Sequence, residues 1–174
     1  MSVYFCSDFH LGHKNIGNFR DDIIATCQQN TDLMQVLWDK RIHKNDLVYC
    51  LGDMAFDQAG LDLLGSWRGR KILVKGNHDD FVSTEAQSKV FEEIHGMLKY
   101  KGFWLTHCPI HPQEMRGRRA NLHGHTHNHI ITRKNWRGAE IPDKRYFNCC
   151  VDVLFPKYKD VFVSLEEVRR IYGV

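Results

Sequence analysis

The chain contains little proline and glycine, with 4 Pro and 13 Gly among 174 residues, and no repeat or low-complexity tract. It also lacks a long apolar run, since no stretch approaches the roughly 18 apolar residues that span a membrane. The first eight residues have no basic segment, and their apolar run is too short for a signal peptide. These absences argue against fibrous, disordered and membrane-spanning classes. We expect a single cytoplasmic domain covering residues 1–174.

The sequence has no strong excess of charge of one sign. Its 24 Lys and Arg against 21 Asp and Glu give a net charge of +3. This mild balance does not by itself indicate nucleic-acid binding, but it would not repel an anionic substrate.

Disulfides are not expected, although the chain has 6 cysteines. Four of them lie in apolar, strand-like runs, where cysteine behaves as a small buried hydrophobe. These four are Cys6, Cys50, Cys149 and Cys150. With no export signal, a reduced protein is the better interpretation.

Short β-branched and aromatic runs alternate with helical stretches and turns. Strands are expected at 3–6, 46–51, 71–75, 97–100, 103–106, 120–122, 146–151 and 161–163. Helices are expected at 21–42, at 57–64, in part of 81–94, and after Ser164, which can cap the last helix ahead of Glu166 and Glu167.

Five of these apolar runs end at residues that can bind a metal. The residues are Asp8 with His10, Asp53, Asn77, His107, and His125 with His127. Ligands gather at the carboxyl ends of strands in open α/β sheets, so these scattered residues are expected to meet. Glycines at 52, 76 and 124 stand beside them, where the chain must turn sharply or approach another group closely.

Each residue taken singly has a structural interpretation. The aspartates could cap helices, Asn77 could form an Asx turn, and single histidines are often surface or core residues. His125 and His127 would share one face if they lay on a strand. The combination at successive strand ends favours a metal site.

The ligand types indicate which metals to expect. Carboxylate, amide and imidazole ligands without thiolates suit Mn²⁺, Fe or Zn²⁺, and seven ligands exceed the four of a structural zinc site. Two metals about 3.5–4 Å apart can share a hydroxide and clamp the attacking and leaving oxygens. We expect two divalent ions per chain, with Mn²⁺ first and Fe, Zn²⁺ or Ni²⁺ as alternatives.

The ordered motifs resemble those of the calcineurin-like metallophosphoesterase superfamily, in particular its small bacterial and phage members. They are Asp8-Phe9-His10, Gly52-Asp53, Gly76-Asn77-His78-Asp79, Thr106-His107 and Gly124-His125-Thr126-His127. The resemblance implies a four-layer α/β sandwich in which two mixed β-sheets are flanked by helices. The expected location is the cytoplasm of a bacterium, or of the host cell if a phage encodes the protein.

The resemblance also implies roles for these residues. One metal would be held by Asp8, His10 and His127. The second would be held by Asn77, His107 and His125, with Asp53 bridging the two. His78 would protonate the leaving oxygen, and either Asp79 or a backbone carbonyl could orient its ring.

Four further residues are candidate substrate contacts. His13 and Asn15 follow the first motif and could contact a phosphate, or could occupy a helix cap. Arg116 and Arg118 lie between two ligand segments and could hold a second phosphate, or could belong to a solvated loop.

The expected activity is hydrolysis of phosphomonoesters, phosphodiesters or both. Small esters, nucleotides, cyclic nucleotides and nucleic-acid ends all fit, and the oligomeric state is left open. The alternative is a non-catalytic scaffold on the same fold. The retromer scaffold subunit is similar to this family but lacks the histidine after the asparagine, whereas His78 is present here.

Overall fold

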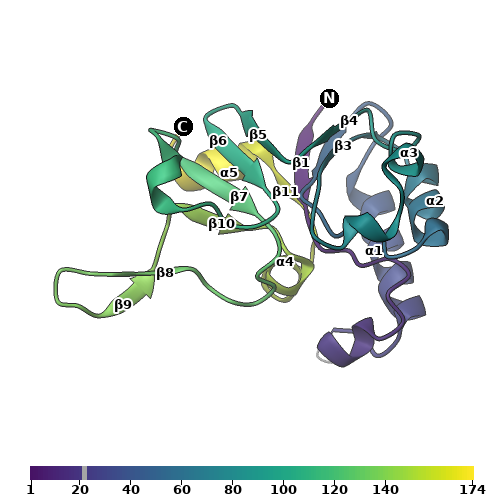
Figure 1. Cartoon of the computed structure of the whole chain (residues 1–174), viewed down its shortest axis with the longest axis horizontal. Coiled ribbons are helices and arrows are strands. Elements are labelled where there is room, and N and C mark those ends of the chain that lie inside the picture. The colour runs from purple at the N-terminus through teal and green to yellow at the C-terminus, as the bar shows by residue number, and fades with distance from the viewer. Residues whose placement is uncertain (21–22) are drawn as a thin grey trace.

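The computed structural model describes residues 1–20 and 23–174, and strands and helices alternate along most of it (Figure 1). The strands are β1 (Val3–Cys6), β2 (Leu47–Cys50), β3 (Arg70–Val74), β4 (Glu93–His95), β5 (Met97–Tyr100), β6 (Phe103–Thr106), β7 (Ala120–His123), β8 (Thr132–Lys134), β9 (Glu140–Pro142), β10 (Tyr146–Asn148) and β11 (Val163–Ser164). The helices are α1 (Cys27–Arg41), α2 (Gln58–Ser66), α3 (Thr84–Gln87), α4 (Val151–Tyr158) and α5 (Leu165–Tyr172). Short 3-10 helices are η1 (Ile16–Phe19), η2 (Asp79–Phe81) and η3 (Pro112–Met115).

Two mixed sheets form the centre of the molecule. The first has the order β11-β1-β2-β3-β4, and all its strand pairs are parallel except β11 with β1. The second has the order β10-β7-β6-β5, in which only β5 is antiparallel to its neighbour. Parallel pairing places the carboxyl ends of β1, β2 and β3 at one edge, and those of β6 and β7 at another.

Two hydrophobic cores hold the layers together. The first lies between α1, α2 and one face of the first sheet, and its largest fully buried side chain is that of Trp38. The second joins the other face of that sheet to the second sheet, for example through Phe5 and Leu105. Tyr172 of α5 packs on Phe103 of the second sheet at 5.8 Å between ring centroids. The expected pair of mixed sheets flanked by helices is confirmed.

The helix caps follow the sequence closely. Thr26 and Gln29 form a capping box at the start of α1, and Ser164 and Glu167 form another at the start of α5. Each box satisfies two backbone N–H groups that have no partner within the helix. The cap expected at Ser164 is therefore confirmed.

Three expected elements, at 21–42, 146–151 and 161–163, are wrong in extent, and the last of these begins only at Val163 as β11. The helix expected at 21–42 begins only at Cys27, and residues 21–22 lie outside the described residues. The helix expected in part of 81–94 is confirmed at 84–87, and the chain then joins the first sheet as β4, with Glu92 N–H bonded to the Lys71 carbonyl. The strand expected at 146–151 stops at Asn148, whose side chain accepts the N–H of Cys150 before α4 begins.

Residues 129–145 form a feature that was not expected, which we call the arm. Its strands β8 and β9 pair only with each other and belong to neither large sheet. Figure 1 shows the arm extending away from the body of the molecule. Among the described residues, no helix is both long and apolar enough to cross a bilayer.

Candidate metal centre

Backbone hydrogen bonds hold the loops after the parallel strands together. Asp8 N–H donates to the Gly52 carbonyl at 3.0 Å, and His10 N–H donates to the Asp53 carbonyl at 3.0 Å. The loops of the second sheet are joined by a 2.9 Å bond from Gly124 N–H to the His107 carbonyl. The pairing of neighbouring strands thus continues into the loops that carry the expected ligands.

Most of the expected ligands have a left-handed backbone. A positive φ is uncommon for residues other than glycine and concentrates at functional sites. The ligands with positive φ are Asp8, His10, Asp53, His125 and His127. His125 and His127 do not lie on a strand, because β7 ends at His123 and both residues are in the following loop.

Two glycines allow loops and ligands to approach each other closely. A Cβ on Gly52 would collide with the His107 ring, and one on Gly76 would collide with the Asp53 carboxylate. Gly52 also has a φ of +91°, a backbone conformation that would be strained in any residue with a side chain. These glycines therefore stand beside the ligands because any larger residue would displace them.

One group of ligand atoms is made by Asp8, His10 and His127, which lie within 4.8 Å of one another. Both ring nitrogens of His10 are buried and have no hydrogen-bond partner among the described residues. Burial lowers the pKa of His10, so its ring is neutral. Burial opposes charge on Asp8 too, but the nearby His10 ring, with Nε2 3.5 Å from Asp8 Oδ1, and the charge of His107 hold the pKa of Asp8 well below its usual range. A neutral imidazole beside a carboxylate suits a divalent cation.

A second group surrounds His107. Its Nδ1 lies 2.8 Å from the Leu51 carbonyl, which leaves Nε2 directed at Asp53 Oδ2, 3.3 Å away. The Asn77 Oδ1 lies 3.0 Å from His107 Nε2 and 3.0 Å from His125 Nδ1. Burial disfavours charge on His107, but its hydrogen bond to Asp53 and the nearby carboxylates raise its pKa to about 9. The carboxylates of Asp53 and Asp8 thus favour a positive charge at this position, as they would favour a bound cation.

Asp8 is close to both groups. It lies within 4.8 Å of the ligand atoms of His10 and His127, and also within this distance of Asp53 and His107. Its Oδ2 accepts the N–H of His125 at 3.1 Å and the thiol of Cys150 at 3.1 Å. These bonds tie Asp8 to the second sheet.

Two residues that support His127 through hydrogen bonds, Asp152 and Arg20, were not predicted from the sequence. Asp152 in α4 lies 2.9 Å from His127 Nδ1 and accepts a 3.0 Å bond from Arg20 Nε. Burial opposes its charge, but these partners lower the pKa of Asp152 to about 2. The hydrogen bond to Asp152 raises the pKa of His127. Such carboxylate partners fix the ring orientation of metal-binding histidines.

Asp79 does not orient the His78 ring. Its carboxylate accepts three backbone N–H groups, from Asp53 at 2.9 Å, Met54 at 3.0 Å and Gly76 at 2.8 Å. Asp79 therefore fastens the loop after β2 to the loop after β3. Of the two groups that could orient the His78 ring, Asp79 and a backbone carbonyl, Asp79 is therefore ruled out.

His78 lies at the rim of the site. Its Nε2 is 4.0 Å from Asp53 Oδ2, and its backbone N–H donates to Asp53 Oδ1 at 2.8 Å. The ring stacks on Phe81 with centroids 5.6 Å apart and an interplanar angle of 12°, and it also contacts Phe56 at 4.9 Å. Its side chain is 41% exposed, so a substrate can reach it.

The four candidate substrate contacts fall in two places. The His13 ring lies 5.9 Å from that of His10, and Asn15 is an exposed residue at the start of η1 with no side-chain capping bond. Arg118 lies just before β7, at the amino ends of the paired strands β6 and β7. The candidate ligands follow the carboxyl ends of these strands, at the opposite side of the sheet. The Arg116 guanidinium pairs with Glu114 at 3.0 Å. The structure brings His13 to the site, but not Arg116 or Arg118.

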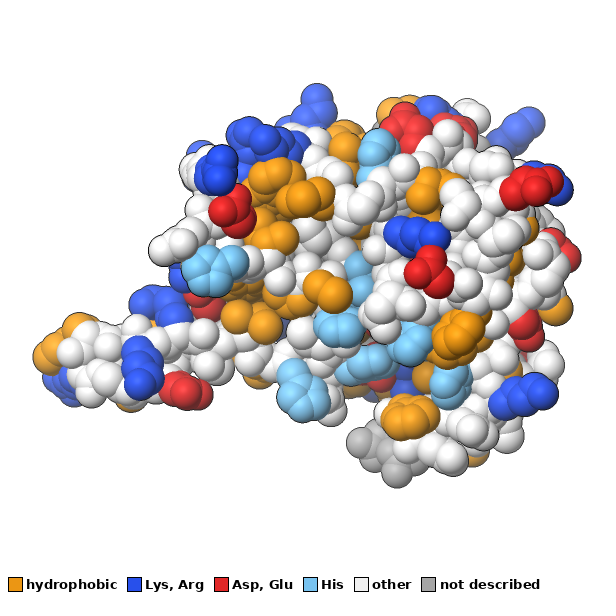
Figure 2. Space-filling model, in the orientation of Figure 1, with side chains coloured by type: hydrophobic (Ala, Val, Ile, Leu, Met, Phe, Trp, Pro, Cys, Tyr) orange, Lys and Arg blue, Asp and Glu red, His pale blue; other side chains and the backbone are white. Residues whose placement is uncertain are grey.

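The residues present fit divalent metal ions. Neutral and anionic donors converge, two histidines have one nitrogen fixed by an oxygen acceptor, and the His10 nitrogens have no protein partner. Buried polar atoms without partners are rare in folded proteins and require an explanation. Figure 2 shows several histidine side chains gathered on one face, where a substrate has access.

Comparison with known proteins agrees with this geometry. Residues 1–161 match the family described as calcineurin-like phosphoesterase. The Gene 66 protein of Mycobacterium phage D29 is 32% identical, over 75% of this chain and 80% of that protein. The Gene 66 protein of Mycobacterium phage L5 is 27% identical, over 80% of this chain and 84% of that protein.

Two solved structures share the fold. A protein of unknown function from Aquifex aeolicus matches with a TM-score of 0.68 and 24% identity, over 98% of each chain. The nuclease MPE of Pseudomonas putida matches with a TM-score of 0.52 and 19% identity, over 80% of this chain and 67% of that chain.

Proposed function

This chain belongs to the calcineurin-like phosphoesterase family, and from that premise we propose that it hydrolyses phosphate esters with two divalent metal ions. The observation that carries the proposal is the convergence of ligand atoms around Asp8 and His107. We assign one ion to Asp8, His10 and His127, and the other to Asn77, His107 and His125. Asp53 is assigned as the bridging ligand, and Mn²⁺ is the expected metal.

Two divalent ions, when bound, lower the pKa of a shared water and neutralise charge on the phosphate. The protein supplies the remaining functions. Asp152 and the Leu51 carbonyl orient the His127 and His107 rings. His78, which is exposed at the rim and stacks on Phe81, is the proposed donor of a proton to the leaving oxygen. His13 and Asn15 remain candidate contacts to the substrate phosphate.

Removal of metal tests the proposal directly. Dialysis against a chelator is expected to abolish hydrolysis of bis(p-nitrophenyl) phosphate and p-nitrophenyl phosphate, and Mn²⁺ is expected to restore it. The relative rates on the two compounds distinguish diesterase from monoesterase activity. Full activity in protein that elemental analysis shows to be free of metal would contradict the assignment, and a metal-loaded chain inactive on every ester would favour a scaffold.

A further inference from the structure

The arm carries the positive charge that the rest of the chain lacks. Residues 129–145 include five basic and two acidic residues, so their net charge of +3 equals that of the whole chain. The basic residues are Arg133, Lys134, Arg137, Lys144 and Arg145. Of these, only Arg145 has a carboxylate within 4.0 Å among the described residues, in its pair with Asp143. The other four are exposed and available to an anionic partner.

The tip of the arm presents an aromatic side chain to solvent. Trp136 is 86% exposed, and the Arg137 guanidinium lies over its ring at 4.3 Å from the centroid. The turn that carries it is well ordered by Asn135, whose side chain accepts the N–H groups of Arg137 and Ala139 at 2.9 and 3.0 Å. A large apolar side chain held this far from any core stabilises nothing in the chain itself, so its exposure points to a partner.

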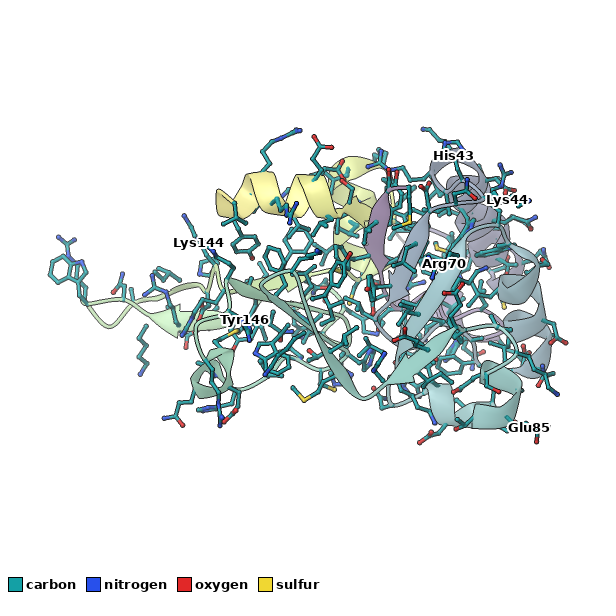
Figure 3. All side chains as sticks on the ribbon, turned by 90° about the horizontal axis from the view of Figure 1, so that it is seen from above. His43, Lys44, Arg70, Glu85, Lys144 and Tyr146 are labelled. Carbon is teal, nitrogen blue, oxygen red and sulfur yellow. The ribbon has the colours of Figure 1, made fainter. Side chains whose placement is uncertain are left out.

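The base of the arm continues into the metal centre. A cavity of about 560 Å³ is lined by His125, His127 and His129, and a second of about 690 Å³ is lined by His129, Arg119 and Lys144. His129 lines both cavities, so the cavity beside the ligands and the one at the cationic base of the arm are neighbours. Figure 3 shows Lys144 where the arm leaves the body, at the opposite end of the molecule from Lys44.

We propose that the arm binds single-stranded nucleic acid and that a phosphodiester of this strand is the substrate of the metal centre. This inference rests on the proposed phosphoesterase function. Unpaired cations that follow a path contact successive phosphates, and an exposed aromatic ring stacks on unpaired bases. A small phosphomonoester would fill the centre alone and would leave the cations and Trp136 without a role. A base within a duplex is already stacked, so the tip favours a single strand.

Binding is measured by fluorescence anisotropy with the full-length, Mn²⁺-loaded chain. The probe is a fluorescein-labelled, phosphorothioate-linked oligonucleotide, which resists hydrolysis, at several salt concentrations. The arm variant carries Arg133→Gln, Lys134→Gln and Arg137→Gln. The control variant carries Lys40→Gln, Lys44→Gln and Lys89→Gln, which removes the same charge from exposed positions in or just after α1 and α3, on the side of the body away from the arm (Figure 1). Hydrolysis of bis(p-nitrophenyl) phosphate is measured for each protein.

The arm variant is expected to bind at least about tenfold more weakly and to lose about two units of the slope of log affinity against log salt. Trp136→Ala is expected to weaken binding roughly tenfold with the slope unchanged. The control variant should keep the wild-type slope, and all variants should hydrolyse bis(p-nitrophenyl) phosphate at the wild-type rate.

Several results would overturn the proposal. They are absence of binding by the wild-type chain, equal slopes in the arm and control variants, and tighter binding of a duplex than of a single strand. A concentration-dependent dimer that Trp136→Ala dissociates, without oligonucleotide binding, would assign the arm to a second copy of the chain. Absence of bis(p-nitrophenyl) phosphate hydrolysis by a wild-type chain that binds the strand would refute the phosphoesterase function while retaining the arm as a binding element.

Discussion

The metal centre and the arm differ in how they are held. At the centre, Asp8 is fully buried and bonded to groups from both sheets, and Asp79 fastens two loops at once. In the arm, β8 and β9 bond only to each other, and most side chains face solvent. A two-stranded hairpin is marginally stable by itself in water, whereas a densely bonded loop is rigid. The rigid centre suits the proposed chemistry, which needs precise positions, whereas the proposed binding by the arm needs only an accessible surface.

The largest effect is expected from Asp53→Asn. Bound metals contribute several kcal/mol to the reaction, so losing the assigned bridge should lower the rate ~10³-fold or more. Metal content should fall from near two per chain towards one or none, as measured by elemental analysis. Because Asp8 is close to both ligand groups, Asp8→Asn is the matched comparison. A smaller loss of metal in Asp53→Asn than in Asp8→Asn would transfer the bridging role to Asp8.

His78→Ala should retain both metals and slow hydrolysis according to the leaving group. An alkoxide needs a proton to leave and should lose ~10²–10⁴-fold, whereas a nitrophenolate should lose less. Phe81→Ala, which removes the ring stacked on His78 without removing the acid, is the control for position. Equal, small losses with both leaving groups would make His78 a bystander.

Asp152→Asn should have an intermediate effect. Its carboxylate orients His127 and pairs with Arg20, and such partners of metal ligands typically contribute 10–100-fold to metal affinity or activity. Titration of the metal-free protein with Mn²⁺ should show weaker binding at one site only. Equal weakening at both sites would mean that Asp152 stabilises the fold rather than the His127 ring.

The smallest effect is expected from Trp136→Ala, in the arm. Its side chain is 86% exposed, so the free energy of unfolding should change by no more than about 0.5 kcal/mol. Trp38→Ala is the contrast, because that side chain is fully buried and its loss should cost ~3–5 kcal/mol. Chemical denaturation of both variants checks the difference. A large loss of stability in Trp136→Ala would show that the arm packs against the body.

The convergence of the candidate ligands at strand ends could be predicted because each one depends on a short stretch of sequence. An apolar run followed by Gly-Asp or Gly-Asn-His is visible within a few residues, and the parallel sheets bring such ends together. The supporting residues could not be predicted in this way. Arg20 and Asp152 are 132 residues apart in the sequence, and nothing near either residue indicates the other.

Local sequence describes two segments incompletely. The segment 81–94 has helix-forming residues, but pairing of β4 with β3 overrides this preference over its last part. The segment 129–145 shows no alternation of apolar and polar residues, because neither face of the arm is buried against the body. Without a core to face, a strand has no pattern by which to be recognised.

The left-handed ligand residues have a consequence for protein engineering. Asp8, His10, Asp53, His125 and His127 all have positive φ. Installing the same side chains on regular strands or helices of another scaffold would therefore aim them in different directions. A transplanted centre would have to include the loops as continuous segments, together with Gly52 and Gly76, which contact His107 and Asp53.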